Sequence, residues 1–319
     1  MTTTGKTVVE RLLDHQTRRQ QNDSTFANGL AISPSTWSRL KEGTYPLKDD
    51  TKISDRLSSA LRMLDDEDAY GRPTIAAPLV VTSHIRAVTD AVKLALREPR
   101  NRLVVYLART GGGKTAGVAR KIEETYPRRA IRAEACETWR GSYFAAARDL
   151  AKAAGVKEEL SGAAHAQQAL LDHLNRERPI VVIDEAHYFG PRTLNLVKAV
   201  VNQTPCVVVL LAIPSLWRSM ERTSWEEAEQ LRCRTVAKIE ASEIKQADAA
   251  SFIREMIPLA SGIDGWQGAV DKCRSAANRF GLYDTLARIC SEVRSEADGG
   301  KVSADMFDAA IVGVEALRK

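Results

Sequence analysis

The sequence predicts an α/β fold in which a parallel sheet is preceded by a small all-α domain and followed by a helical bundle. Three observations support this prediction. Short β-rich runs alternate with helical stretches between residues 80 and 240, which is the pattern of a parallel sheet covered by helices. Helical patterns without β-rich runs fill residues 1–64 and 241–319. The length of 319 residues suits about two domains of roughly 150 residues each.

The domain boundaries follow from breaks in these patterns. We expect a helical domain over 1–64 and a linker over 65–79, because an acidic run is followed there by a loop with glycine and proline. The α/β domain is expected over 80–240 and the helical bundle over 241–319. The expected strands are Leu103–Leu107, Ala130–Ala135, Ile180–Ile183, Val207–Ala212 and Thr235–Ile239.

The composition excludes several classes of protein. Hydrophobic residues make up 44% and charged residues 27% of the chain, which argues against a disordered or collagen-like protein. The longest apolar runs are far shorter than the roughly 20 residues of a membrane-spanning helix, so no membrane partner is expected. Met1–Glu10 lacks the apolar core of a secretion leader, and five scattered cysteines without a C-x-x-C pair indicate free thiols in a reducing compartment. The net charge of +5 allows an anionic partner without identifying one.

A glycine-rich loop follows the first expected strand and precedes a helical stretch. It is close to the phosphate-binding pattern G-x-x-x-x-G-K-[ST], with Ala108 in place of the first glycine. The backbone N–H groups of such a loop point at phosphates from a helix N-terminus. Lys114 is expected to reach the β- and γ-phosphates, and Thr115 to place its hydroxyl on Mg²⁺. The candidate nucleotide-binding residues are Arg109, Thr110, Gly111, Gly112, Gly113, Lys114 and Thr115.

A second motif supplies two carboxylates. The apolar run Ile180–Ile183 ends in Asp184 and Glu185, about 70 residues after Lys114. A buried strand that delivers acids at its C-terminal end places them in the ligand crevice of an open α/β sheet. We expect Asp184 to hold Mg²⁺ through its water shell and Glu185 to polarise the attacking water as a general base. The two motifs together predict an ATPase with ATP and Mg²⁺ as cofactors, and with Lys114 and Glu185 as catalytic residues.

The same acids allow another interpretation. Asp184–His187 spells the DEAH box of one helicase group. Such helicases need a second recA-like domain, and only about 80 residues of helical pattern follow the sheet. The helicase interpretation is therefore disfavoured.

The order of these motifs resembles the AAA+ ATPases, with Walker A at Ala108–Thr115, Walker B at Ile180–Glu185, a sensor strand and a helical lid. In this family, an arginine finger reaches the γ-phosphate of a neighbouring subunit from the segment that matches Glu229–Arg234. The resemblance implies Arg234 as the first candidate for this catalytic role and Arg232 as the second. The alternative is an ordinary surface arginine on a helix.

Two sensor positions depart from the family pattern. The sensor 1 strand is followed by Ile213 where the family has a polar residue, and Ser215 is the nearest polar substitute. The sensor 2 pattern Gly-x-x-Arg is matched by Gly281–Asp284, which ends in an acid. Arg279 and Arg288 are the nearby arginines.

The N-terminal segment 24–43 resembles the helix-turn-helix of repressor-type DNA-binding domains. Ser33 is expected to cap the second helix and Pro34 to occupy its first position, while Trp37 and Leu40 face inward. This leaves a recognition surface that would meet bases and phosphates in the major groove. Its candidate DNA-binding residues are Ser35, Thr36, Ser38 and Arg39. An ordinary three-helix interaction module would show the same capping.

The whole layout, a helix-turn-helix, a linker and one AAA+ module with a short lid, resembles the phage Mu B transposition protein family and the related Tn7-type target-selection ATPases. This resemblance implies an ATP-dependent, largely sequence-independent DNA-binding ATPase. Such a protein forms a homo-oligomer on target double-stranded DNA and activates a transposase, in the cytoplasm of a bacterial host cell or at its nucleoid. In these ATPases, loops after the second strand touch DNA, which implies Thr138 and Arg140 as phosphate contacts. Alternatively, Trp139 is a core residue and Arg140 a solvated cap.

Two rival functions share these features. A helicase loader or replication initiator would have nearly the same AAA+ core. A transcription regulator would use nucleotide only to switch the helix-turn-helix, and it would bind one operator sequence rather than any duplex.

Overall fold

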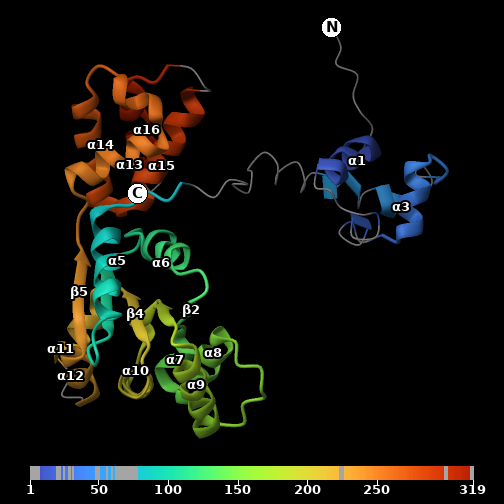
Figure 1. Cartoon of the computed structure of the whole chain (residues 1–319). Helices are drawn as coiled ribbons and strands as arrows, with labels where there is room; N and C mark the ends of the chain where they lie inside the picture. The colour runs from blue at the N-terminus through green and yellow to red at the C-terminus, as the bar shows by residue number, and fades with distance from the viewer. Residues whose placement is uncertain are drawn as a thin grey trace. The chain divides into compact units, whose positions relative to one another are not determined.

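The computed structural model describes residues 8–18, 23, 26–27, 30, 32–46, 51–54, 57–58, 60–61, 78–222, 226–297 and 301–316. The chain forms two compact units, 1–77 and 78–319 (Figure 1). Residues 62–77, which hold most of the predicted linker, lie outside the described residues, as does part of the first helix of the predicted helix-turn-helix.

The first unit contains the helices α1 (Val8–Arg18) and α3 (Pro34–Lys41). Ser33 caps α3, because its Oγ accepts a hydrogen bond from Thr36 N at 3.0 Å, and Pro34 occupies the first helical turn. Trp37 is fully buried, packs against Phe26 at a ring separation of 5.2 Å and donates through Nε1 to Gln16. The predicted capping and inward face of this helix are thus present.

The second unit is built on a parallel sheet of five strands in the order β2-β3-β4-β1-β5. All its pairings are parallel, which confirms the predicted fold class. Each expected strand is present, and its observed ends lie within two residues of the expected ends. The strands are β1 (Leu103–Ala108), β2 (Ala130–Glu134), β3 (Ile180–Asp184), β4 (Val207–Ala212) and β5 (Thr235–Ala241).

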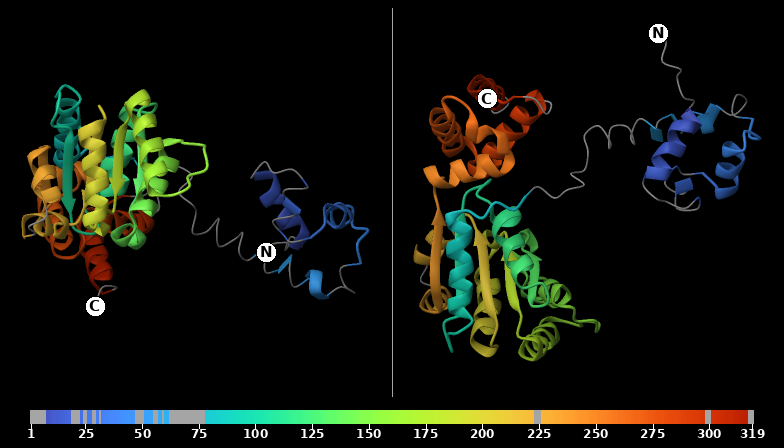
Figure 2. Two further views of the ribbon diagram at one scale, coloured as in Figure 1. Left: turned by 90° about the horizontal axis from the view of Figure 1, so that it is seen from below. Right: turned by 45° about the horizontal axis from the view of Figure 1, so that its top comes forward.

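Helices cover both faces of this sheet (Figures 1 and 2). Alternate residues of each strand pack on opposite faces, so that Val104 and Val182 join the apolar cluster under α5 and α6, whereas Val105 and Val181 join the cluster under α7 to α10. The helices around the sheet are α5 (Ser83–Ala95), α6 (Arg120–Thr125), α7 (Glu137–Gly141), α8 (Tyr143–Ala154), α9 (Ala163–Glu177), α10 (Pro191–Gln203), α11 (Ser215–Arg222) and α12 (Glu226–Cys233).

The C-terminal helices form a lid with its own apolar cluster, which confirms the predicted helical bundle. It lies at one end of the sheet, beyond the end of β5 (Figure 1). Its elements are α13 (Gln246–Met256), the 3-10 turn η3 (Pro258–Gly262), α14 (Trp266–Phe280), α15 (Leu282–Ala297) and α16 (Ala304–Ala316). Among the described residues, no helix is both long and apolar enough to cross a bilayer.

All five cysteines are described and are free thiols, as their spacing indicated. Cys136 and Cys233 are exposed. Burial raises the pKa of the Cys273 thiol to about 12 and also raises the pKa of Cys206 and Cys290, so these three thiols are protonated and inert at neutral pH.

Candidate nucleotide-binding site

The glycine-rich loop adopts a backbone that only glycine accepts easily. Gly111 and Gly113 have φ angles of +79° and +74°, where a Cβ atom would be strained. At Gly112, a Cβ would lie 2.4 Å from the Cβ of Ala108, so the loop folds tightly back on the end of β1. The chain then enters η1 (Lys114–Ala119), a π-helical turn that precedes α6, whereas the sequence indicated a regular helix here. The first N–H groups of this turn have no preceding helical turn to bond to.

Lys114 is a buried cation at the start of this turn. Its side chain is only 7% exposed, and its Nζ donates to the carbonyl oxygens of Ala108 at 3.1 Å and Arg109 at 3.4 Å. Within the described residues, no ion pair involves Lys114. A buried ammonium group without a counter-ion is unfavourable, and an anionic ligand at the loop would supply that counter-ion. The loop therefore fits a phosphate group.

Thr115 and Asp184 meet across 69 residues of sequence. Thr115 Oγ1 donates to Asp184 Oδ2 at 2.6 Å, and Asp184 is 1% exposed. The second carboxylate oxygen of Asp184 accepts from the backbone N–H of Glu185 at 2.9 Å. Hydroxyl and carboxylate oxygens are the ligands that Mg²⁺ prefers, and it usually takes only one or two of them from protein. The pair therefore fits a magnesium ion beside the phosphates.

Arg132 also reaches this carboxylate, although the sequence analysis did not select it as a site residue. Its guanidinium NH2 lies 3.5 Å from Asp184 Oδ2. The contact arises because β2 pairs with β3 in a register that places Arg132 opposite Val182, on the face of the sheet that carries Asp184. The signal in the sequence was a basic residue within the strand Ala130–Glu134.

Glu185 has a left-handed backbone conformation, with φ +52° and ψ +32°. Such a conformation is strained for a side chain larger than glycine and is typical of functional sites. The Glu185 Oε2 atom lies 3.1 Å from His187 Nδ1, and the His187 ring packs against Tyr188 at 4.5 Å. Glu185 is thus held next to Asp184, beyond the end of β3.

A comparison with protein-family models gives a match that includes this site. Residues 97–220, which include the loop and both acids, match the family model of the AAA domain. This region is an AAA-type P-loop ATPase domain.

The structure is similar to those of two archaeal proteins. Cdc6p from Pyrobaculum aerophilum shares 14% identity at a TM-score of 0.52, over 73% of this chain and 66% of that chain. The ORC1 protein of Aeropyrum pernix, solved in complex with DNA, shares 18% identity at a TM-score of 0.50, over 76% of this chain and 68% of that chain. The chain thus spans about two thirds of the length of each, and the likeness is one of fold. Comparison with curated proteins gives no match.

The C-terminal lid rests directly on the glycine-rich loop. The backbone N–H of Asp284 donates to the Gly111 carbonyl at 3.3 Å, and Arg109 donates through its guanidinium to the carbonyl of Asn278. A Cβ at Gly111 would lie 1.9 Å from the Gly281 carbonyl oxygen. Arg109 thus contacts the lid, while Thr110 is exposed at the tip of the loop.

The arginines near the sensor 2 position have other partners. Arg288 pairs with Asp284 at 3.1 Å, one helical turn along α15, and Arg279 pairs with Glu315 at 2.5 Å. The Asp284 carboxylate next to the loop is therefore already paired with a counter-ion, Arg288.

Arg232 and Arg234 lie at the opposite end of the sheet. The Arg234 carbonyl accepts from Leu103 N at 3.3 Å, which places it beside the start of β1, whereas the glycine-rich loop follows the end of β1. The six residues of β1 span about 20 Å. Both arginines are half-buried, and Arg234 lines a cavity of about 350 Å³ together with Asn202, Glu226, Glu229, Gln230 and Cys233. Neither can reach the phosphates of its own subunit.

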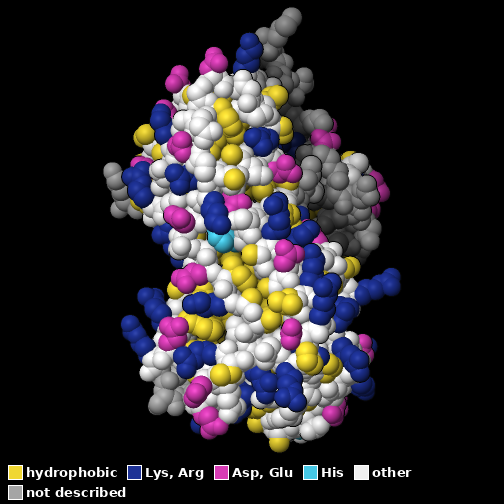
Figure 3. Space-filling model, turned by 60° about the vertical axis from the view of Figure 1, so that its left-hand side comes forward, with side chains coloured by type: hydrophobic (Ala, Val, Ile, Leu, Met, Phe, Trp, Pro, Cys, Tyr) yellow, Lys and Arg dark blue, Asp and Glu magenta, His cyan; other side chains and the backbone are white. Residues whose placement is uncertain are grey.

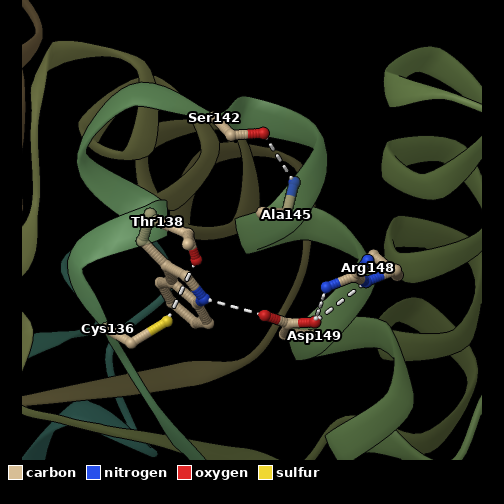
Figure 4. Close-up of polar contacts among 7 residues, drawn as sticks. Cys136, Thr138, Ser142, Ala145, Arg148 and Asp149 are labelled. Atoms are coloured by element: carbon tan, nitrogen blue, oxygen red, sulfur yellow. Dashed lines mark hydrogen bonds and ion pairs between the residues drawn. The ribbon is translucent and has the colours of Figure 1, made fainter.

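The segment after β2 forms the short helix α7, in which Thr138 and Arg140 lie instead of on a loop, and Figure 4 shows the polar contacts around it. Trp139 is 1% exposed and donates through Nε1 to Asp149 at 3.1 Å, so it is a core residue. Thr138 is exposed and bonds the Cys136 thiol, and Arg140 is exposed and pairs with Glu137 at 3.1 Å. Thr138 and Arg140 therefore remain available on the surface.

Two of the four candidate DNA-binding residues of α3, Ser35 and Thr36, contact the helix cap. Ser33 Oγ lies 2.9 Å from Ser35 Oγ and 2.7 Å from Thr36 Oγ1. Ser35 and Arg39 are exposed, and Thr36 and Ser38 are half-buried. The Arg39 guanidinium lies over the Tyr45 ring at 5.3 Å. The DNA-reading role of these four residues stays a prediction.

We predict that Gly111→Ala separates the lid from the loop. The new Cβ would meet the Gly281 carbonyl, and the positive φ adds strain of about 1–3 kcal/mol. The expected results are a lower thermal midpoint and a loss of nucleotide affinity, measured by calorimetry and by fluorescent nucleotide titration. Gly268→Ala in α14, where a Cβ meets open space, is the control and should be neutral or slightly stabilising. An unchanged thermal midpoint and an unchanged nucleotide affinity in Gly111→Ala would contradict this role of the contact between the lid and the loop.

Proposed function

We propose that the chain is a DNA-associated ATPase that assembles on double-stranded DNA when it binds Mg²⁺ and ATP. The observation that carries the ATPase part is the buried Lys114, which has no carboxylate partner among the described residues, next to the contact between Thr115 and Asp184. A site that already holds one uncompensated cation and two oxygen ligands suits a nucleotide phosphate and its magnesium ion.

Different residues of the chain have different roles in hydrolysis. Lys114 binds the β- and γ-phosphates, and the N–H groups of Gly113 and Lys114 orient them, whereas the N–H of Gly112 donates to the Arg109 carbonyl at 3.0 Å. Thr115 and Asp184 hold Mg²⁺, which supplies neutralisation of the charge on the transferred phosphate. Glu185 accepts the proton of the attacking water and orients that water. The His187 ring lies 3.1 Å from the Glu185 carboxylate, and the strained backbone of Glu185 follows directly on Asp184.

Arg234 completes this site in a neighbouring subunit, with Arg232 as the second candidate. Its position at the far end of β1 excludes action on its own nucleotide. The half-buried side chain lines an open cavity that a neighbour can enter on assembly. Hydrolysis should therefore be slow in isolated subunits, because an arginine supplied from a partner contributes much of the rate in such sites.

The finer function that we propose is target selection in DNA transposition, in which the oligomer coats a duplex and activates a transposase. The order of the domains and their lengths support this proposal. Replication initiation is a second candidate, which the fold likeness to Cdc6p and to the DNA-bound ORC1 protein favours. Electron microscopy with ATP and random duplex DNA separates the two, because continuous coating of any sequence supports target selection and discrete particles at one origin sequence support initiation.

Lys114→Ala is predicted to abolish ATP binding, because the loop loses its only buried cation. Glu185→Gln should bind ATP with nearly unchanged affinity but fail to hydrolyse it. Fluorescent nucleotide titration and phosphate release measure the two effects, and Lys121→Ala on α6 is the control for loss of charge. Wild-type ATP affinity in Lys114→Ala would remove the basis of the ATPase proposal.

A mixing experiment tests Arg234. Arg234→Ala and Lys114→Ala subunits lack different halves of a composite site, so mixtures on DNA should regain part of the ATPase rate through interfaces that join an intact loop to an intact arginine. The rate is measured across mixing ratios, with assembly followed by sedimentation. No recovery in mixtures that do assemble would count against action between subunits.

The division of labour in DNA binding is tested by two variants. A protein lacking residues 1–70 should keep ATP-dependent, sequence-indifferent binding, and Arg140→Ala in the full chain should lower the log–log salt slope by about 0.9 for each lost phosphate contact. Affinity is measured against salt concentration with a non-hydrolysable ATP analogue. Glu137→Gln is the matched control, and it should tighten binding because it frees Arg140 from its ion pair. Complete loss of DNA binding in a truncated protein that still assembles would favour the transcription regulator.

A further inference from the structure

The segments that lead into the strands of the sheet are rich in arginine. All five strands are parallel, so their N-terminal ends lie together at one end of the sheet. The nucleotide site lies at the opposite end. Segments 97–102, 127–129, 176–179 and 232–234 precede β1, β2, β3 and β5, and we call them together the arginine edge. Nine arginines and two glutamates give this edge a formal charge of +7, against +5 for the whole chain. The arginines are Arg97, Arg100, Arg102, Arg128, Arg129, Arg176, Arg178, Arg232 and Arg234.

Backbone contacts place these segments side by side. Arg129 donates through its guanidinium to the Arg178 carbonyl at 3.0 Å, which joins the starts of β2 and β3. The Arg102 carbonyl accepts from Val208 of β4 at 2.9 Å, and the Arg234 carbonyl accepts from Leu103 of β1. Neighbouring strands lie about 4.8 Å apart, so the row extends over about 19 Å from β2 to β5. The arginine edge is thus a line of positive charge across the sheet.

The residue that precedes β4 in this row carries no charge, but the positive charges of the nearby arginines act on it. Cys206 is buried just before β4, and burial raises the pKa of its thiol. The Thr204 side chain and, more weakly, the positive charges of Arg102 and Arg129 act against that rise.

Helix capping explains only part of this cluster. Helices end at this edge, and their C-terminal carbonyls attract cations. Arg102 donates to the Glu98 carbonyl at 2.7 Å and Arg129 to the Arg178 carbonyl, so these two side chains have a structural role. Arg100, Arg128 and Arg176 are exposed, and no hydrogen bond or ion pair among the described residues engages their side chains. Their guanidinium groups are free to bind a ligand.

The composition of the edge favours a phosphate backbone over other anionic partners. Arginine presents a planar fork of donors that matches phosphate oxygens, and the edge contains no lysine. Besides arginine, the four segments contain only Glu, Pro, Asn and Cys, so they offer no large apolar side chain that would enter a lipid surface. Figure 3 shows Lys and Arg side chains spread over this face, including its lower end, where Asp and Glu side chains lie among them.

We infer that the arginine edge binds the phosphate backbone of double-stranded DNA, at a surface distinct from Thr138 and Arg140. The inference rests on the proposed association with DNA and adds a second contact surface to it. Binding at this edge reads no bases, because guanidinium–phosphate contacts carry no sequence information. Within one subunit, the glycine-rich loop and the arginine edge thus lie at opposite ends of the sheet, and Arg232 and Arg234, at the β5 end of the row, remain available to the nucleotide site of a neighbouring subunit.

The test neutralises the three exposed arginines in the full chain. Arg100→Gln, Arg128→Gln and Arg176→Gln are combined, and the control combines Arg86→Gln, Arg254→Gln and Arg294→Gln, which removes the same charge from exposed positions outside the edge. Affinity for a random fluorescent duplex is measured against salt with a non-hydrolysable ATP analogue. The edge variant should lose about tenfold in affinity near 0.1 M salt and 2 to 3 units of log–log slope, at about 0.9 per contact. The control should change little.

Further measurements separate the possible failures. Thermal midpoints and ATP affinities should be equal in all proteins, and replacement of the same three residues by lysine, which keeps the charge, should restore most of the affinity. Equal loss in the edge and control variants, or no loss in the edge variant, overturns the inference while leaving the proposed function intact. A wild-type chain that binds ATP but no duplex overturns the proposed association with DNA, and the inference with it.

Discussion

The hydrogen bond between Thr115 and Asp184 is the contact on which the rest of the site depends. It joins the helical turn after β1 to the end of β3, although β4 lies between these strands in the sheet. The two side chains meet because the chain crosses over twice in the parallel order and because both strands end at the same edge. Once they meet, the start of η1 and the acid at the end of β3 lie side by side.

Much of this arrangement could be predicted from the sequence, because it depends on local patterns. The strands follow from β-rich runs, the cap at Ser33 from its neighbours, and the pairing of Thr115 with Asp184 from two motifs that strand ends bring together. Contacts that depend on register or on long-range packing could not be predicted. Arg132 reaches Asp184 only through the pairing of β2 with β3, and Gly111 meets Gly281 only because the lid folds back over the loop.

The lid contact gives the loop a second function. Gly111 is bonded to the lid through its carbonyl, and Arg109 is bonded to the end of α14. Leu282, in the turn that makes this contact, has a φ of +50°, a strained conformation that the surrounding packing must maintain. Any ligand that shifts the loop must therefore shift α14 and α15. Because the lid and the sheet have separate apolar clusters, such a movement leaves both cores intact.

The placement of Arg234 at one end of the sheet and the glycine-rich loop at the other restricts the symmetry of any assembly. A subunit that offers its arginine to a neighbour uses a different surface from the one that receives an arginine, so the contact is head-to-tail and cannot form a two-fold dimer with both sites complete. Repetition of such a contact produces either a closed ring or an open helix. In a ring every site is complete, whereas an open helix always leaves one terminal site without its arginine. The ATPase rate per subunit in a helix would therefore rise with length towards a plateau, which makes turnover a measure of how long the assembly has grown.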